Sequence, residues 1–105
     1  MLWRNWSGTQ SAYPSLRSAP KTEAELAQAL KTVSAPIRPV GAGHSFTALV
    51  PTSGTLMTLD QMAGIERWEG DEAVVWTGTR LGALGQALAA KGRAMPNLPD
   101  INKQS

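Results

Sequence analysis

A glycine-rich turn that ends in a histidine is the feature of this sequence best suited to chemistry. Gly41, Ala42 and Gly43 precede His44 and Ser45, directly after a short apolar stretch. Glycines behind a buried strand let successive backbone amides approach an anion such as a phosphate, because no side chain intervenes. The pattern therefore favours an anion-binding turn, although Gly-x-Gly alone also occurs in ordinary turns.

The histidine of this turn has two interpretations. His44 is the single histidine of the chain, and its type alone fits a loop imidazole that is hydrogen-bonded to the backbone or exposed to water. A neutral imidazole beside a bound cofactor could instead act as nucleophile, base or covalent tether. The residue types do not choose among these roles.

The turn departs from two widespread nucleotide-binding motifs. Phe46 stands where the dinucleotide fingerprint Gly-x-Gly-x-x-Gly has its third glycine, and no helix is predicted directly after the turn. A Walker phosphate loop needs a Gly-Lys-Ser/Thr ending, which the turn lacks. We therefore expect neither a Rossmann site nor a P-loop.

Composition limits the other chemistry. With no cysteine and one histidine, these residues form no disulfide, no thiolate nucleophile and no paired-histidine or thiolate metal centre. Carboxylates gather at one predicted turn and are interpreted as its solvated surface (Glu66, Glu69, Asp71 and Glu72). The tryptophans lie on different elements and are interpreted as packing residues (Trp3, Trp6, Trp68 and Trp76).

Short strands must position the glycine turn. Residues 37–40 are predicted to form a strand after Pro36, since proline lacks an amide donor and disfavours helix in the residue before it. One strand is expected before the first helix, and others at residues 55–59, 65–68 and 73–77. The last two should form an antiparallel hairpin around Gly70.

Two helices are expected beside these strands. Thr22 and Glu25 form a capping box, and the apolar residues that follow share one helical face (Leu26, Ala29, Leu30 and Val33). A second helix should begin near Arg80, bury a leucine stripe, and stop at a left-handed Gly92.

Size and charge set further bounds. A chain of 105 residues makes at most one small domain with a thin stability margin. The net charge is +2 with scattered basic residues, so a nucleic-acid partner is not expected. No apolar run approaches the roughly 20 residues that cross a bilayer. We expect a soluble, cytoplasmic protein without a transmembrane segment.

Two motifs carry a resemblance to a known family. Residues 3–8 (WRNWSG) and 38–46 (RPVGAGHSF) resemble the N-terminal flavin-binding region of the sugar-lactone and alditol oxidases, which belong to the vanillyl-alcohol oxidase type of flavoproteins. The likeness runs through residues 20–26, 76–84 and 94–101. It covers essentially the whole chain.

The resemblance implies a site and a cofactor. It assigns FAD, with the pyrophosphate bound by a loop of six residues (Val40, Gly41, Ala42, Gly43, His44 and Ser45). In several members the equivalent of His44 is bonded to the flavin 8α carbon, and Ser105 is expected near the flavin. Substrate and base residues would lie beyond Ser105, so no catalytic residue is expected in these 105 residues.

The fold implied is an α+β, N-terminal subdomain of a two-part FAD-binding domain of the PCMH type, a short sheet covered by two helices. Residues 1–93 would form this subdomain and residues 94–105 would lead to the second, making the chain an N-terminal fragment that is inactive alone. Apolar faces left uncovered predict self-association.

The function implied is oxidation of a sugar lactone or polyol with dioxygen as electron acceptor. Two alternatives remain open. One is a noncovalent flavoenzyme that resembles UDP-N-acetylenolpyruvoylglucosamine reductase, and the other is a non-catalytic interaction module in which the glycine turn is only a turn.

Overall fold

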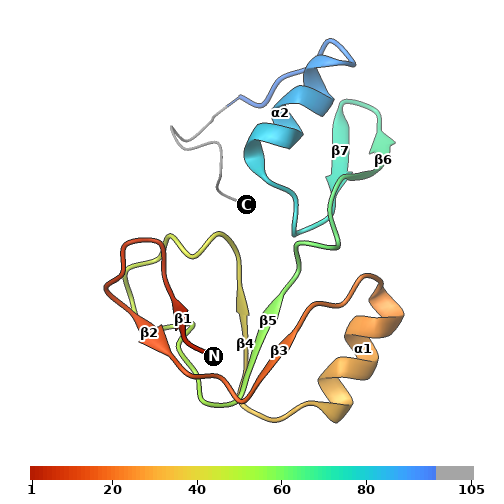
Figure 1. Cartoon of the computed structure of the whole chain (residues 1–105). Helices are drawn as coiled ribbons and strands as arrows, with labels where there is room; N and C mark the ends of the chain where they lie inside the picture. Colours follow the sequence, from red (N-terminus) through yellow and green to blue (C-terminus); the bar gives the residue numbers. More distant parts are fainter. Residues whose placement is uncertain (97–105) are drawn as a thin grey trace.

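Two lobes make up the structure, a computed structural model in which residues 1–96 are described (Figure 1). The lower lobe holds five strands and a helix: β1 (Trp3–Arg4), β2 (Ser11–Ala12), β3 (Leu16–Ser18), α1 (Glu23–Thr32), β4 (Ile37–Val40) and β5 (Thr55–Thr58). The upper lobe holds β6 (Ile65–Glu69), β7 (Glu72–Val75) and α2 (Leu81–Ala89). Ser105 and most of the predicted segment 94–105 lie outside the described residues.

A three-stranded parallel sheet forms the centre of the lower lobe, with β5 between β3 and β4. Thr55 pairs with Leu16 on one side and with Ile37 on the other. Because β5 has a neighbour on each side, its first three residues are buried, with Leu56 and Met57 each 2% exposed. Val40, at the end of β4, completes this core.

Helix α1 begins at the predicted capping box. The Thr22 hydroxyl accepts the Glu25 amide at 3.1 Å, while the Glu25 carboxylate accepts the amide of Lys21 at 3.1 Å rather than that of Thr22. The predicted apolar face is only partly covered, because Leu30 is 54% exposed and no residue of α1 is fully buried. Local capping therefore supplies a large share of the stability of this helix.

Removal of this cap should loosen α1. Thr22→Ala deletes the side-chain acceptor of the first turn, and we expect the helix to lose about 1 kcal/mol of stability. Hydrogen-exchange mass spectrometry on residues 23–32 measures the change directly. Thr32→Val is the control, since the Thr32 hydroxyl bonds the Gln28 carbonyl in the last turn and caps no free amide. An equal increase in hydrogen exchange of residues 23–32 in both variants would contradict the prediction.

The upper lobe follows the predicted pattern of hairpin and helix. β6 and β7 pair antiparallel, with Glu69 opposite Glu72 and Gly70 in the turn at φ +62°. Helix α2 ends in a Schellman motif, in which the Arg93 amide donates to the Leu88 carbonyl at 2.9 Å and Gly92 has φ +67°. Both the hairpin and the left-handed stop are confirmed.

The expectation of one short sheet covered by two helices is wrong, although the mixed helix and strand content is as expected. The described residues form three separate sheets, β1–β2, β3–β5–β4 and β6–β7. β5 ends at Thr58 and the chain then turns into the upper lobe, so the β6–β7 hairpin pairs only with itself (Figure 1). Helix α2 accordingly belongs to the upper lobe with that hairpin, and α1 belongs to the lower lobe with the three-stranded sheet (Figure 1).

The two lobes are joined where residues 59–64 meet residues 76–79. The Gly78 amide donates to the Met62 carbonyl at 3.0 Å, and the Gly64 amide donates to the Thr79 hydroxyl at 2.8 Å. Gly78 has no room for a side chain, because a Cβ placed there would overlap the Leu59 carbonyl. The joint thus depends on direct contact between two backbones.

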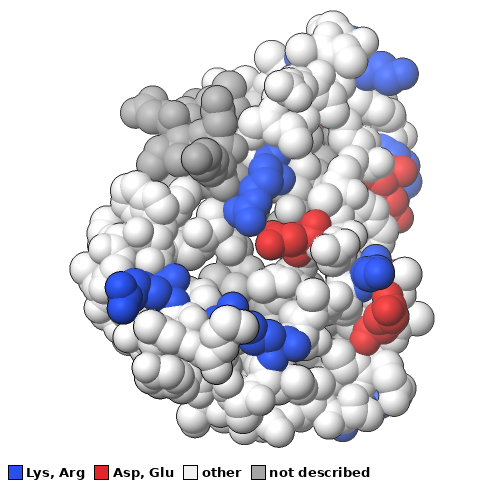
Figure 2. Space-filling view, viewed as in Figure 1, with Lys and Arg blue, Asp and Glu red and all other residues white. Residues whose placement is uncertain are grey.

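The surface carries both apolar and charged side chains. Seven large apolar residues are exposed (Met1, Trp6, Tyr13, Leu16, Leu30, Phe46 and Leu49). Trp6 is therefore not a core residue of the described structure, and packing of Trp6 against a second subdomain stays a prediction. Self-association stays a prediction. Basic side chains are spread over both lobes on the face in Figure 2 rather than gathered in one patch. Within residues 1–96, no helix has the length and apolar character needed to cross a membrane.

Candidate functional site

The glycine turn lines a cavity at the end of β4. Residues Val40 to Ser45, together with Val50, surround a space of about 370 Å³. Val40 is buried in the sheet core at 8% exposure, and so anchors the start of the turn. The structure thus brings six of the seven predicted site residues together around one cavity, while Ser105 lies outside the described residues.

The backbone of the turn requires glycine at one position. Gly43 has φ +77°, a left-handed conformation that residues with a Cβ adopt at a cost. Its carbonyl accepts the Trp6 amide at 2.7 Å. A Cβ at Gly43 would lie 3.5 Å from that amide nitrogen, an ordinary contact. Backbone conformation rather than lack of space therefore explains the glycine.

His44 lies against Trp6 and has an unpaired polar atom. The two rings meet edge to face, with centroids 4.9 Å apart and planes at 75°. The Nδ1 atom of His44 is buried, and among the described residues it has no hydrogen-bond partner. Such an atom is costly when left unpaired, so a ligand that pairs with it gains affinity. This geometry is what a group poised beside a ligand requires.

Asn5 belongs to the site and was not predicted to do so. Its side chain is buried, with the residue 5% exposed, and its Nδ2 donates to the Ser45 carbonyl at 2.9 Å. Sequence reasoning cited Asn5 only within the motif that resembles the flavin oxidases. No local pattern marks it, because its partner is far along the chain.

The described part of the cavity wall is uncharged. Among residues 1–96, no Lys or Arg lines the 370 Å³ space, and Arg38, the basic residue nearest the turn in sequence, is exposed. An anion in this cavity would thus be bound by backbone amides. The acidic residues of the β6–β7 turn are solvent-facing and paired: Glu66 and Glu69 contact Arg67, and Asp71 contacts Arg93 at 2.7 Å.

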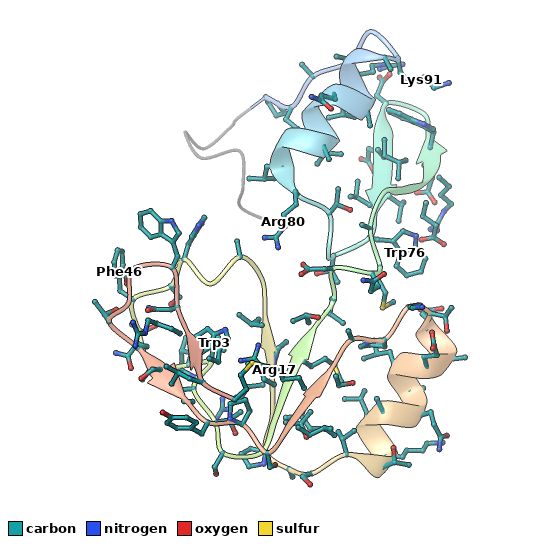
Figure 3. All side chains as sticks on the ribbon, in the orientation of Figure 1. Trp3, Arg17, Phe46, Trp76, Arg80 and Lys91 are labelled. Carbon is teal, nitrogen blue, oxygen red and sulfur yellow. The ribbon has the colours of Figure 1, made fainter. Side chains whose placement is uncertain are left out.

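Two further cavities continue from the turn toward α2. A space of about 270 Å³ shares Val40 and Gly41 with the first cavity, and a space of about 480 Å³ shares Asp60 and Gly78 with the second. Arg80 points from the start of α2 toward the lower lobe (Figure 3) and pairs with Asp60 at 3.3 Å. The three adjoining spaces suit an elongated ligand.

A glycine turn that follows a parallel strand and lines a cavity is an arrangement that can bind an anion through backbone amides. Comparison with known proteins makes this specific. The FAD binding domain family matches residues 14–105. The chain belongs to this family.

Characterised relatives agree with the family. The chain is 34% identical over 116 residues to the L-gulono-1,4-lactone dehydrogenase of Mycobacterium tuberculosis, covering 99% of this chain and 26% of the relative. It is 32% identical over 113 residues to the D-arabinono-1,4-lactone oxidase of Eremothecium gossypii, covering 99% and 21%. The predicted resemblance to the sugar-lactone oxidases is confirmed, and the chain spans about a quarter of the length of these relatives.

Proposed function

We propose that this chain is the FAD-binding segment of an oxidoreductase that oxidises a sugar lactone. The observation that carries the proposal is the match of residues 14–105 to the FAD binding domain family, in a structure where the Val40–Ser45 turn lines a cavity. The names of the relatives favour an aldonolactone over a polyol, since those cited act on L-gulono- and D-arabinono-1,4-lactone.

The residues present fit FAD. Amides of residues 41–45 would bind the pyrophosphate, as glycine-rich turns do for phosphate groups. His44, whose Nδ1 atom is buried and has no hydrogen-bond partner among the described residues, is one of the residues that line the same cavity. When bound, FAD supplies the two-electron acceptor for alcohol oxidation, and the protein supplies binding and orientation.

His44 is the proposed attachment point of the flavin. The attachment would replace the imidazole N–H of His44 and one C–H of the flavin 8α methyl group by a C–N bond, and dioxygen would accept the two protons and two electrons released. His44 is one of the residues that line the cavity, which is the observation that supports an attachment point there. A tether at this point keeps the cofactor from dissociating.

Reduction of the bound flavin tests the proposed activity. The full-length protein should be yellow, and its visible flavin absorbance should bleach when an aldonolactone is added without oxygen. Readmission of dioxygen should restore the colour if dioxygen is the electron acceptor. A yellow protein that reacts only with another substrate class would overturn the lactone proposal, and a colourless protein that takes up no added FAD would favour an interaction module.

Gly43→Ala should weaken FAD binding through the shape of the turn. The left-handed backbone costs a residue with a Cβ about 1–2 kcal/mol, so the turn either strains or changes shape. We expect about a tenfold or greater loss in the affinity of the FAD-free protein for FAD, measured by titration. Gly70→Ala is the control: Gly70 has φ +62° with open space around it but lies in the β6–β7 turn. Equal losses in both variants would contradict the role of the turn.

A further inference from the structure

The segment Asn5–Trp6 is hydrogen-bonded to the carbonyls of the two residues on either side of His44. The Trp6 amide donates to the Gly43 carbonyl at 2.7 Å, and the Asn5 side-chain amide donates to the Ser45 carbonyl at 2.9 Å. The Trp6 ring also meets the His44 imidazole edge to face at 4.9 Å. Two adjacent residues thus bond the residue before the histidine and the residue after it, and one of them also contacts its ring.

Asn5 itself is fixed from the β1–β2 hairpin. Its Oδ1 accepts the Gln10 amide at 3.0 Å, and its backbone amide donates to the Gln10 carbonyl at 2.9 Å. Its Nδ2 also donates to the Thr9 hydroxyl at 3.1 Å. The side chain uses its acceptor toward the hairpin, so the amide must present its donors to Thr9 and Ser45.

Closure of the hairpin does not account for the bond to Ser45. The Gln10 and Thr9 bonds of Asn5 lie within the hairpin, whereas the Ser45 bond joins residues 40 apart in the chain. A buried polar side chain is favoured by satisfied hydrogen bonds, and here one of them fixes the turn that carries His44. The β1–β2 hairpin therefore restrains the conformation of the glycine turn through the hydrogen bond from Asn5 to Ser45.

We infer that Asn5 and Trp6 are positioning residues that orient His44 for its bond to the flavin. The inference rests on the proposed attachment at His44. Bond formation depends steeply on the placement of the reacting atoms, and a shift of about 1 Å can cost about a hundredfold in rate. Two carbonyl anchors and one ring contact restrict the imidazole in this way.

Asn5→Asp in the full-length protein tests the inference. At neutral pH the carboxylate of the variant can still accept the Gln10 amide, but it has no hydrogen to donate to the Ser45 carbonyl. We expect covalent FAD incorporation into FAD-free protein to slow by about tenfold or more, and the amides of residues 41–47 to exchange faster with deuterium. Thr9→Val is the matched control, because it removes the bonds of the Thr9 hydroxyl to Asn5 Nδ2 and to the Ser7 hydroxyl but leaves the bond from Asn5 to Ser45 in place. It should leave both measurements within about twofold of wild type.

Trp6→Leu provides a second variant in case the buried carboxylate impairs folding. Trp6 is 62% exposed, so its ring adds little to the core, and its backbone amide remains. Loss of the edge contact should slow incorporation by about threefold or more without lowering the unfolding midpoint. Wild-type incorporation rates in both Asn5→Asp and Trp6→Leu, or an equal slowing in Thr9→Val, would overturn the inference.

Failure of the proposed attachment has a different signature. A wild-type protein that binds FAD but never couples overturns the attachment, and with it the part of the inference that concerns bond formation. Whether Asn5 and Trp6 fix the conformation of the glycine turn is then decided by hydrogen–deuterium exchange of the FAD-free protein. Faster exchange of residues 41–47 in Asn5→Asp alone supports it, and unchanged exchange overturns it.

Discussion

His44→Ala is expected to abolish the covalent flavin completely. The full-length wild-type protein, denatured and weighed intact, should carry a flavin-sized mass increment, and the variant should carry none. The reason is chemical, because alanine offers no nucleophilic nitrogen to the 8α carbon. The fold should survive, since among the described residues the Nδ1 atom has no hydrogen-bond partner that the substitution would leave unpaired.

Ser45→Ala is the neighbouring control for this experiment. The Ser45 hydroxyl bonds the Thr47 hydroxyl at 3.0 Å on the surface, and the carbonyl held by Asn5 is unchanged. This variant should keep the full mass increment. An increment that persists in His44→Ala would place the linkage elsewhere, and a yellow wild-type protein without any increment would make the protein a noncovalent flavoenzyme.

Gly78→Ala is expected to destabilise the protein severely. The added Cβ would overlap the Leu59 carbonyl and approach the Met62 carbonyl at 3.0 Å, and backbone atoms cannot rotate away as side chains do. Relief requires residues 59–64 to move apart from residues 76–79. We expect a loss of at least about 3 kcal/mol, measured as a lower urea midpoint or, where the protein no longer folds, as loss of soluble protein.

Gly85→Ala is the matched control in the same lobe. Gly85 lies within α2, and a Cβ there meets nothing within 4 Å. Alanine is the better helix former, so this variant should gain about 0.4–1 kcal/mol. Similar midpoints for the two variants would refute the role given to the backbone contact at Gly78.

Local signals in the sequence account for the elements that were predicted correctly. β4 follows Pro36 and occupies the predicted residues 37–40, because proline ends the preceding helix and the strand carries its own apolar pattern. The turn at Gly70 and the stop at Gly92 each need a left-handed residue, and glycine marks that need in the sequence. Thr22 likewise indicates the start of α1, because its side chain caps the first turn of the helix.

Pairing between distant segments could not be predicted locally. β1 and β2 have two residues each, too few to show a period, and their role depends on the reach of Asn5 to Ser45. The separation into three sheets depends on which strands meet, and short strands with similar patterns do not encode their partners. For the site, the glycine turn could be predicted from the sequence. The hydrogen bonds from Asn5 and Trp6 to the turn, and the close backbone contact at Gly78, depend on tertiary structure and could not.

The strand order of the lower lobe has a consequence for the order in which its strands can pair during synthesis. β5 is last of the three strands in the sequence, yet it is the central one, and β3 and β4 each pair with it alone. During synthesis, β3 and β4 therefore have no strand to pair with until residues 55–58 leave the ribosome. Contacts between segments so far apart form slowly, and β4, which leads into the glycine turn, settles only then. A nascent chain that ends before Thr55 would therefore expose the unpaired strands β3 and β4 to aggregation.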